Sequence, residues 1–283
     1  IKHAPQRALE YDVIEHPIAL QLGGSNPKEL AEAAIRAEQL GYDEINLNLG
    51  CPSNRVQAGN FGASLMREPD TVANCVRAMK RAVSIPVTVK TRIGIDKQDS
   101  FDFFYDFVMW CIDAGAKKVV VHARKAWLKG LNPKQNRTIP PIHYDYVYRL
   151  KKLVGVPVII NGEIHSLNAI KEHLNQVDGV MLGRKVYSDP SFLLSIDKNL
   201  YGEDTFCSID NALKEYMNYI LNLDNRKDSN RAINHLMQFI KSLSIEKNKR
   251  KEILEKLNNK NEELNSIFDD FTQGCQRNLS PNL

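Results

Sequence analysis

The stretch at residues 44–55, EINLNLGCPSNR, decides the fold. Glu44–Leu49 predicts a short strand, and the Gly-Cys-Pro that follows ends this strand in a loop. Outward from it the chain repeats one pattern: an apolar, β-branched run ends in Gly, Asn or a charged residue, and an amphipathic stretch follows. The runs predict strands at 17–22, 44–49, 87–92, 118–123, 157–161 and 179–182.

Helical spacing between the strands predicts helices at 27–40, 69–83, 101–114, 144–153, 166–174 and 190–200. Asn26-Pro27 and Asp189-Pro190 each offer a cap followed by Pro at the first helical position. We interpret the strands as continuous apolar runs, which are typical of strands covered on both faces. Strands that alternate with helices indicate parallel βαβ units. The fold class is therefore α/β, either a (β/α)8-type barrel or an open doubly wound sheet, and six strands alone do not decide between them.

The character of the chain changes at about residue 205, where Gly and Pro become rare. Apolar residues then recur at helical spacing in three groups, which predict a small domain of three or four helices. These residues are Leu213, Met217, Ile220 and Leu221; Ile233, Leu236, Met237 and Ile240; and Ile253, Leu254 and Leu257. The predicted domains are 1–204, the (β/α) unit, and 205–283, the helical unit.

Composition excludes several classes of protein. The 283 residues contain no apolar run near the roughly 20 residues that a membrane span needs. Five scattered cysteines without a CxxC pair predict neither a zinc site nor a disulfide framework, and they favour a reducing, cytoplasmic setting. The net charge of +4 permits a nucleic-acid partner without requiring one.

Polar or Gly-rich residues follow nearly every predicted strand. Because ligands of parallel α/β proteins bind at the carboxyl ends of the strands, these residues form the candidate site. They are Gln21 with Gly23-Gly24, Asn46, Asn48 and Cys51, Lys90 and Arg92, His122 and Arg124, Asn161-Gly162-Glu163, and Gly183-Arg184.

The last two strands end in Gly-rich turns shortly before helices, which is a pattern for phosphate binding by backbone N–H groups, with Arg184 adding charge. A barrel of this type binds phosphate after strands seven and eight, so the six strands would be numbers three to eight, with the first two absent. Lys90 would lie near the barrel centre, where a cation suits an anion formed during reaction, such as reduced flavin. Cys51, on a loop at the same face, could serve as acid, base or nucleophile.

Each residue also has a plainer interpretation. A lone Cys is more often a small buried hydrophobe, and Cys75 and Cys111 on helices fit that description. His122 could be a satisfied core histidine, Lys90 a snorkelling surface residue, and Arg124-Lys125 a solvated pair. The residues alone therefore predict a phosphate-containing cofactor in a (β/α)-barrel with a loop thiol, and nothing more specific.

Longer motifs add a resemblance. The chain resembles the flavin-dependent tRNA-dihydrouridine synthases, over roughly residues 16–204, and its A-type bacterial branch in particular. The matching stretches are NLNLGCPSNR at 46–55, GNFGA at 59–63, VTVKTRIG at 87–94, VHARKAWLKGLNPKQNR at 121–137, NGEI at 161–164 and MLGR at 181–184.

The resemblance implies a role for individual residues. FMN would contact Gln21, Lys90 and His122, and its phosphate would lie against Asn161, Gly162, Glu163, Gly183 and Arg184. Cys51 would be the catalytic general acid. Asn48, Arg124 and Lys125 would face the tRNA.

The resemblance also implies the reaction. NADPH reduces FMN, hydride passes from flavin N5 to C6 of a flipped-out uracil, and Cys51 protonates C5. The substrate would be uridine 20 or 20a in the tRNA D-loop, with the helical domain helping to bind the tRNA. We expect no metal, no membrane association and a monomer.

Two departures from the family pattern keep alternatives open. The family's first two barrel strands are missing, so the sequence would be either truncated or degraded. Glu163 stands where the family usually has Gly, and we expect its side chain to point away from the phosphate. A dihydroorotate- or dihydropyrimidine-dehydrogenase-like flavoenzyme and an inactive tRNA-binding remnant are the alternatives.

Overall fold

The structure is a computed structural model that describes residues 9–202, 209–242 and 247–258. The chain separates into two compact units, 1–181 and 182–283. Each is considered by itself below. The boundary between these units, at 181/182, differs from the domain boundary at 204/205 that the composition suggests. The latter stays a prediction.

Six parallel strands form the sheet of the first unit. Its neighbours follow the order of the chain, β1 through β6, with no reversal. A doubly wound sheet reverses its order at a switch point, whereas a (β/α)-barrel adds each strand beside the last. The order therefore confirms the barrel-type α/β fold, as an arc from β1 to β6 within the described residues. The strands are β1 Ala19–Leu22, β2 Glu44–Leu49, β3 Val87–Arg92, β4 Val119–His122, β5 Val158–Asn161 and β6 Gly179–Met181.

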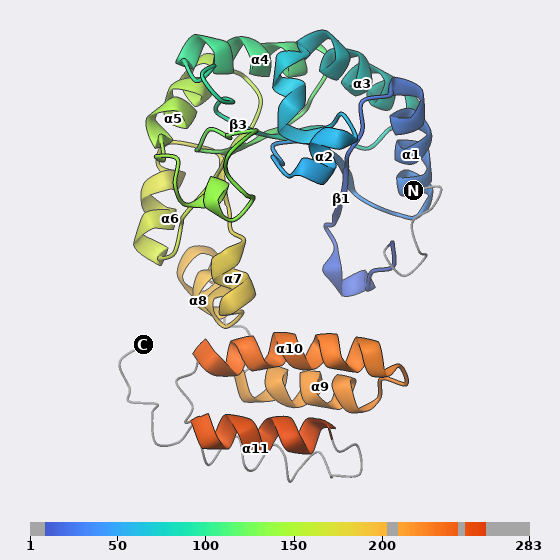
Figure 1. Cartoon of the computed structure of the whole chain (residues 1–283), viewed down its shortest axis with the longest axis vertical. Helices are drawn as coiled ribbons and strands as arrows, with labels where there is room; N and C mark the ends of the chain where they lie inside the picture. The colour runs from blue at the N-terminus through green and yellow to red at the C-terminus, as the bar shows by residue number, and fades with distance from the viewer. Residues whose placement is uncertain (1–8, 203–208, 243–246, 259–283) are drawn as a thin grey trace. The chain divides into compact units, whose positions relative to one another are not determined.

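Helices line the outer, convex side of this arc, as Figure 1 shows. The long ones are α1 Pro27–Gln39, α3 Pro69–Ala82, α4 Phe101–Asp113, α5 Tyr144–Leu153 and α6 Leu167–Leu174, all close to the predicted ranges. In the described part of the first unit, four short helices were not predicted, because three to six residues leave no periodic pattern. They are η2 Val13–Glu15, α2 Asn54–Ala58, η3 Gly62–Arg67 and η4 Gln135–Arg137.

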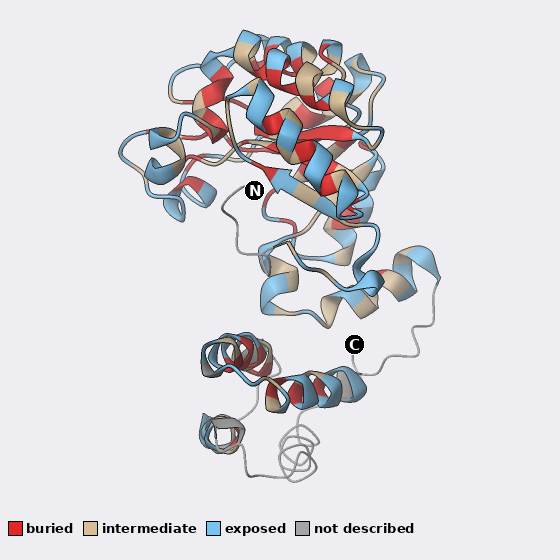
Figure 2. Ribbon diagram, turned by 90° about the vertical axis from the view of Figure 1, so that its right-hand side faces the viewer, coloured by how far each residue is buried: buried red, intermediate tan, exposed pale blue. Residues whose placement is uncertain are grey.

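The strands carry different side chains on their two faces. In β2, Ile45, Leu47 and Leu49 are fully buried, whereas the alternate residues Asn46 and Asn48 hydrogen-bond to side chains of neighbouring strands. Successive strand residues point to opposite faces, so the apolar set lies under the helices and the polar set lies on the concave side. The prediction of continuous apolar strands is therefore wrong for β2, and Figure 2 shows the buried residues in the sheet and on the helix faces turned to it.

Helix caps were predicted correctly at one of two positions. Asn26 Oδ1 accepts hydrogen bonds from the amides of Lys28 and Glu29 and begins α1. Asp189 instead follows α7 (Arg184–Ser188), where it accepts from Lys185 Nζ at 2.7 Å. The helix predicted at 190–200 is present as α8 (Phe192–Ile196), which continues directly into a π-helical turn, η5 (Asp197–Tyr201).

Among its described residues, the second unit also contains three C-terminal helices, where three or four were predicted. They are α9 Ile209–Leu221, α10 Arg226–Ser242 and α11 Lys247–Asn258. They pack on one another around one apolar core, seen in red in Figure 2. The periodicity of the sequence therefore identified this core correctly. Its buried members are Leu213, Met217, Ile220, Ala232, Ile233, Leu236, Ile240 and Ile253.

Replacing Asn26 tests the cap of α1. Asn26→Ala removes the acceptor of two amides and should lower the free energy of unfolding by about 1 kcal/mol, whereas Asn26→Asp keeps the acceptor and should change it little. Urea unfolding followed by tryptophan fluorescence reports on the first unit, because Trp110 and Trp127 both lie in it. Equal losses in the two variants would contradict this role of the side chain.

Candidate active site at the carboxyl edge of the sheet

Amide side chains join the first three strands on the concave side. Gln21 Nε2 donates to Asn46 Oδ1 at 2.8 Å, and Asn46 Nδ2 donates to Thr88 Oγ1 at 2.9 Å. Asn48 Nδ2 donates to Gln21 Oε1 at 2.9 Å. Gln21 and Asn48, predicted to contact flavin and tRNA respectively, therefore lie in direct contact.

Lys90 lies in the middle of the arc. Its Nζ donates to Asn161 Oδ1 at 3.0 Å, and Asn161 Nδ2 donates to the carbonyl of Met181 at 2.8 Å. Burial, and secondarily the charge of Arg92, lowers the pKa of Lys90 to about 8. In the described part of the chain no carboxylate lies within ion-pair distance of this ammonium group. The structure thus brings Lys90 and Asn161 together, as the candidate site requires.

His122 lies between these groups. The strand register pairs it with Arg92 on β3 and with Asn161 on β5, and it is 8% exposed. Gly162 has a φ of 128°, and a Cβ on it would lie 2.9 Å from His122 Cδ2. Only glycine therefore fits beside the imidazole in this turn.

The loop that carries Cys51 is held through its backbone. Asn48 Oδ1 accepts from the amides of Gly50 and Cys51, each at 3.1 Å. Arg92 Nε donates to the Gly50 carbonyl at 2.8 Å, and the amide of Ala63 donates to the Cys51 carbonyl at 2.9 Å. The Cys51 thiol is half-buried, and its Sγ lies 3.5 Å from Ser53 Oγ. The loop is thus rigid around a thiol that solvent can reach.

The other described cysteines are inert by comparison. Cys75 on α3 and Cys111 on α4 are buried, and burial raises their pKa to about 11 and about 12. A thiol with so high a pKa is protonated and without access to a substrate. Cys51 is therefore the only described cysteine in a position to act on a ligand.

Arg92 has a role that its position at a strand end does not by itself reveal. Its side chain is buried and donates to the carbonyls of Gly50, Lys125 and Asn136. Burial lowers its pKa to about 10. The signal available was its position two residues after Lys90, which places both side chains on the same face.

The predicted tRNA-facing cations are both paired. Arg124 is 4% exposed, and its Nη2 lies 2.5 Å from Glu163 Oε2. Lys125 Nζ lies 2.5 Å from Asp99 Oδ2 and 4.6 Å from the centre of the Trp127 ring. The tRNA contact of Arg124 and Lys125 stays a prediction.

Glu163 has a backbone that explains why glycine suits this position. Its φ is 52°, in the left-handed region that favours Gly. The ion pair with Arg124 neutralises the carboxylate that would otherwise oppose a phosphate. Whether its amide faces a phosphate remains a prediction, as it does for Asn161 and Gly162.

Gly183 and Arg184 lie near the start of the second unit, directly after its first residue, Leu182. Gly183 precedes the first residue of α7, which is Arg184. The phosphate-binding role of these two residues stays a prediction from the sequence.

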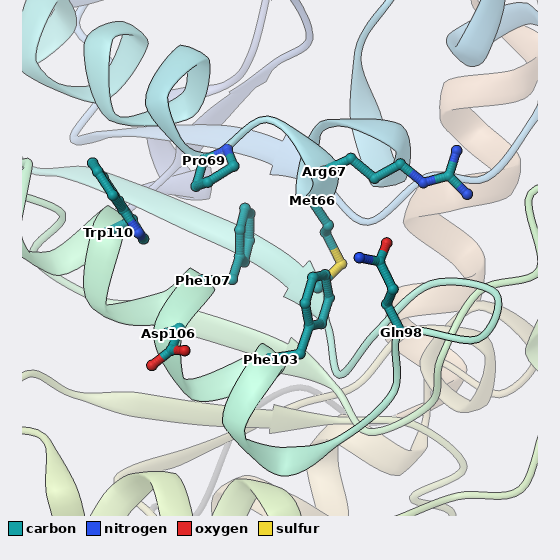
Figure 3. A pocket seen from close by; sticks show the side chains of 8 residues that line it. All are labelled: Met66, Arg67, Pro69, Gln98, Phe103, Asp106, Phe107 and Trp110. Carbon is teal, nitrogen blue, oxygen red and sulfur yellow. The ribbon is translucent and has the colours of Figure 1, made fainter.

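A separate pocket of about 250 Å³ lies between η3, the loop after β3 and α4 (Figure 3). Its walls include Met66, Phe103, Phe107 and Trp110, and none of the predicted site residues lines it. Over the described residues, no three His, Cys, Asp or Glu side chains are grouped to hold a metal ion. None of the described helices is long and apolar enough to cross a membrane.

The fold and the site define a class: a barrel-type α/β protein with a buried cation, an amide network and a loop thiol at the carboxyl edge of its sheet. Comparison with known proteins then narrows the class. The family model "Dihydrouridine synthase (Dus)" matches residues 1–276, and the chain belongs to this family.

Three relatives named tRNA-dihydrouridine(20/20a) synthase are similar to this chain. The protein from Xanthomonas campestris is 50% identical over 84% of this chain and 70% of its own length. Those from Vibrio vulnificus and Shewanella oneidensis are each 55% identical, over 72% and 71% of this chain and 64% and 61% of theirs. The chain spans about two thirds of the length of these relatives. The resemblance expected from the sequence is confirmed.

Titration of Lys90 should be visible in stability. Its pKa is about 8 in the folded chain and 10.5 ordinarily, so between these values the unfolded chain binds more protons and stability rises with pH. Lys90→Met removes this dependence. From pH 7.5 to pH 10, wild type should gain up to about 3 kcal/mol relative to Lys90→Met in urea unfolding. If the stability of the two proteins changed equally with pH, Lys90 would not be desolvated in the folded chain.

Two replacements separate the backbone and charge effects at Glu163. Both Glu163→Ala and Glu163→Gly leave Arg124 buried without its carboxylate, and Glu163→Ala should cost roughly 2 kcal/mol of stability. Glycine relieves the left-handed φ, so Glu163→Gly should be roughly 1 kcal/mol more stable than Glu163→Ala in the same denaturation. If the Ala variant were as stable as the Gly variant, the left-handed backbone at position 163 would not be strained.

Proposed function

We propose that this chain is the flavin-binding and acid-bearing portion of a tRNA-dihydrouridine synthase that reduces uridine 20 or 20a in the D-loop. The observation that carries the proposal is the Cys51 loop, which Asn48 fastens beside Gln21 on the concave side that also holds Lys90. Family membership and the names of the relatives support this reaction over other uses of a thiol near a cation.

The residues present fit FMN. Lys90 is a partly buried cation that donates a hydrogen bond to a neutral amide, Asn161, so it can stabilise an anionic ring system. Gln21 offers an amide group for a flavin edge, and Asn48, which we assign to the tRNA, lies in contact with it. Gly162 has no side chain, so the backbone of this turn can lie against His122. Bound FMN, reduced by NADPH, would supply a hydride equivalent to C6 of uracil.

The chain's own contribution is proton delivery and positioning. Cys51 donates its thiol proton to C5, so that one hydride and one proton together saturate the C5–C6 bond. The fixed backbone of the loop holds the sulfur in place for this transfer. Because stacked bases hide both carbons, the uridine must be turned out of the tRNA stack to reach Cys51.

The substrate is tRNA rather than a free base, since the chain continues into helices α9–α11. These helices would contact the tRNA by shape and backbone, as is common for folded RNA. Arg124 and Lys125 lie on the loop after β4, where a bound tRNA could exchange places with Glu163 or Asp99 as their anionic partner. We place the protein in the cytoplasm, where NADPH and tRNA meet.

The test is product formation. Purified chain would be incubated with FMN, NADPH and unmodified tRNA, and the digested nucleosides analysed by mass spectrometry. Cys51→Ala should reduce dihydrouridine formation by a factor of about 100 or more, because it removes the acid. Cys75→Ala is the matched control and should retain activity, since Cys75 is buried on α3.

The full-length Xanthomonas campestris relative serves as the positive control of the assay. Free uridine and dihydroorotate serve as competing substrates. Turnover of a free pyrimidine with none of tRNA would favour a dehydrogenase. Binding of tRNA by this chain without any product, in an assay where the relative is active, would favour an inactive remnant.

A further inference from the structure

We propose that Arg92 is a positioning residue that, together with Gln57, joins the Cys51 loop to the loop after β4 and so places the thiol against its substrate. The catalytic consequence rests on the proposed function. The joining of the two loops rests on contacts within the first unit alone.

The first end of this connection is the backbone of Gly50, Cys51 and Pro52. Their two amide groups are bonded to Asn48, and their three carbonyls accept from Arg92, Ala63 and Gln57. Proline has no amide hydrogen, so every backbone hydrogen-bonding group of these three residues has a partner. The segment can therefore move only if Asn48, Ala63, Arg92 and Gln57 move with it or release it.

The second end is the loop that follows β4. Arg92 Nη1 donates to the carbonyls of Lys125 and Asn136, each at 3.0 Å. Gln57 Nε2, which bonds to Pro52, also donates to the carbonyl of Leu128 at 2.8 Å. Two side chains from different elements, one on β3 and one on α2, thus connect the same pair of loops.

The loop after β4 has an internal brace. Asn136 is fully buried; its Oδ1 accepts from the Trp127 amide at 2.7 Å and its Nδ2 donates to the Trp127 carbonyl at 2.9 Å. A shift at the Asn136 carbonyl, which Arg92 holds, would therefore carry through to Trp127 and to the Lys125 beside it. The two loops should move as one body.

Arginine is suited to this task and lysine is not. The planar guanidinium presents several N–H donors in fixed directions, here toward three carbonyls on two loops. A lysine keeps the charge but offers a single flexible nitrogen. Displacement of a catalytic group by about 1 Å can cost about 100-fold in rate, so loosening Cys51 should affect the chemical step more than binding.

The test compares Arg92→Lys and Gln57→Met with two controls on outer helices, Arg77→Lys on α3 and Gln39→Met on α1. Gln57→Met removes both hydrogen bonds of the side-chain amide at a half-buried position. It keeps the inference testable if Arg92→Lys does not fold. Hydrogen–deuterium exchange is measured on peptides covering 48–53 and 124–137. Alkylation of Cys51 by iodoacetamide is followed on the same peptides.

We expect both loops to exchange faster in each test variant, with Cys51 alkylation changed by about threefold or more, and neither control to differ from wild type. In steady-state reduction of tRNA uridine, kcat should fall about tenfold or more. The KM for tRNA and the rate of flavin reduction by NADPH should stay within about twofold.

Two results would overturn the inference. One is faster exchange in the Cys51 loop alone, since it would show that the loops are not joined. The other is a raised KM for tRNA with unchanged exchange, since it would make Arg92 a direct substrate contact. Exchange and alkylation need no activity, so they separate failure of this inference from failure of the proposed function.

Discussion

The desolvation of polar and charged side chains on the concave face is the constraint on which the rest of the structure depends. A barrel interior is usually filled with branched apolar side chains, yet β2 and β3 turn Asn46, Asn48, Lys90 and Arg92 inward. Each buried polar group costs free energy unless it has a partner. The partners come from neighbouring strands, which fixes strand register and side-chain positions together.

The Cys51 thiol is positioned by this arrangement. Cys51 lies outside the sheet, on a segment that without support would be an ordinary surface loop. Asn48 and Arg92 transmit the rigidity of β2 and β3 to it, because both side chains begin on strands and end on the loop's backbone. A group that must meet one face of a planar base benefits from placement by such a scaffold.

Glu163 shows how a charged residue is accommodated at a left-handed position in a turn. Its backbone is in a region favoured by glycine, which costs stability, and its carboxylate compensates by pairing with buried Arg124. The ion pair also neutralises Arg124, a cation that lies just after the end of β4. The local balance of charge at this edge therefore depends on a contact between residues 39 positions apart.

Much of the fold followed from the sequence by itself. The alternation of apolar runs with helical stretches determined the α/β class, the six strands and the three C-terminal helices, since periodicity reports directly on which faces are buried. The same patterns missed α2 and η3, because helices of about one turn leave no periodicity.

The candidate site was likewise predicted only in part from the sequence. Sequence placed Cys51, Lys90 and His122 at strand ends, because parallel strands bring their carboxyl ends to one edge. Only the tertiary structure decided between a barrel and a doubly wound sheet, since strand order depends on pairing and not on local pattern. It alone showed that Arg124 pairs with Glu163 and that Arg92 connects two loops, because side chains choose partners by distance in space, which local sequence does not encode.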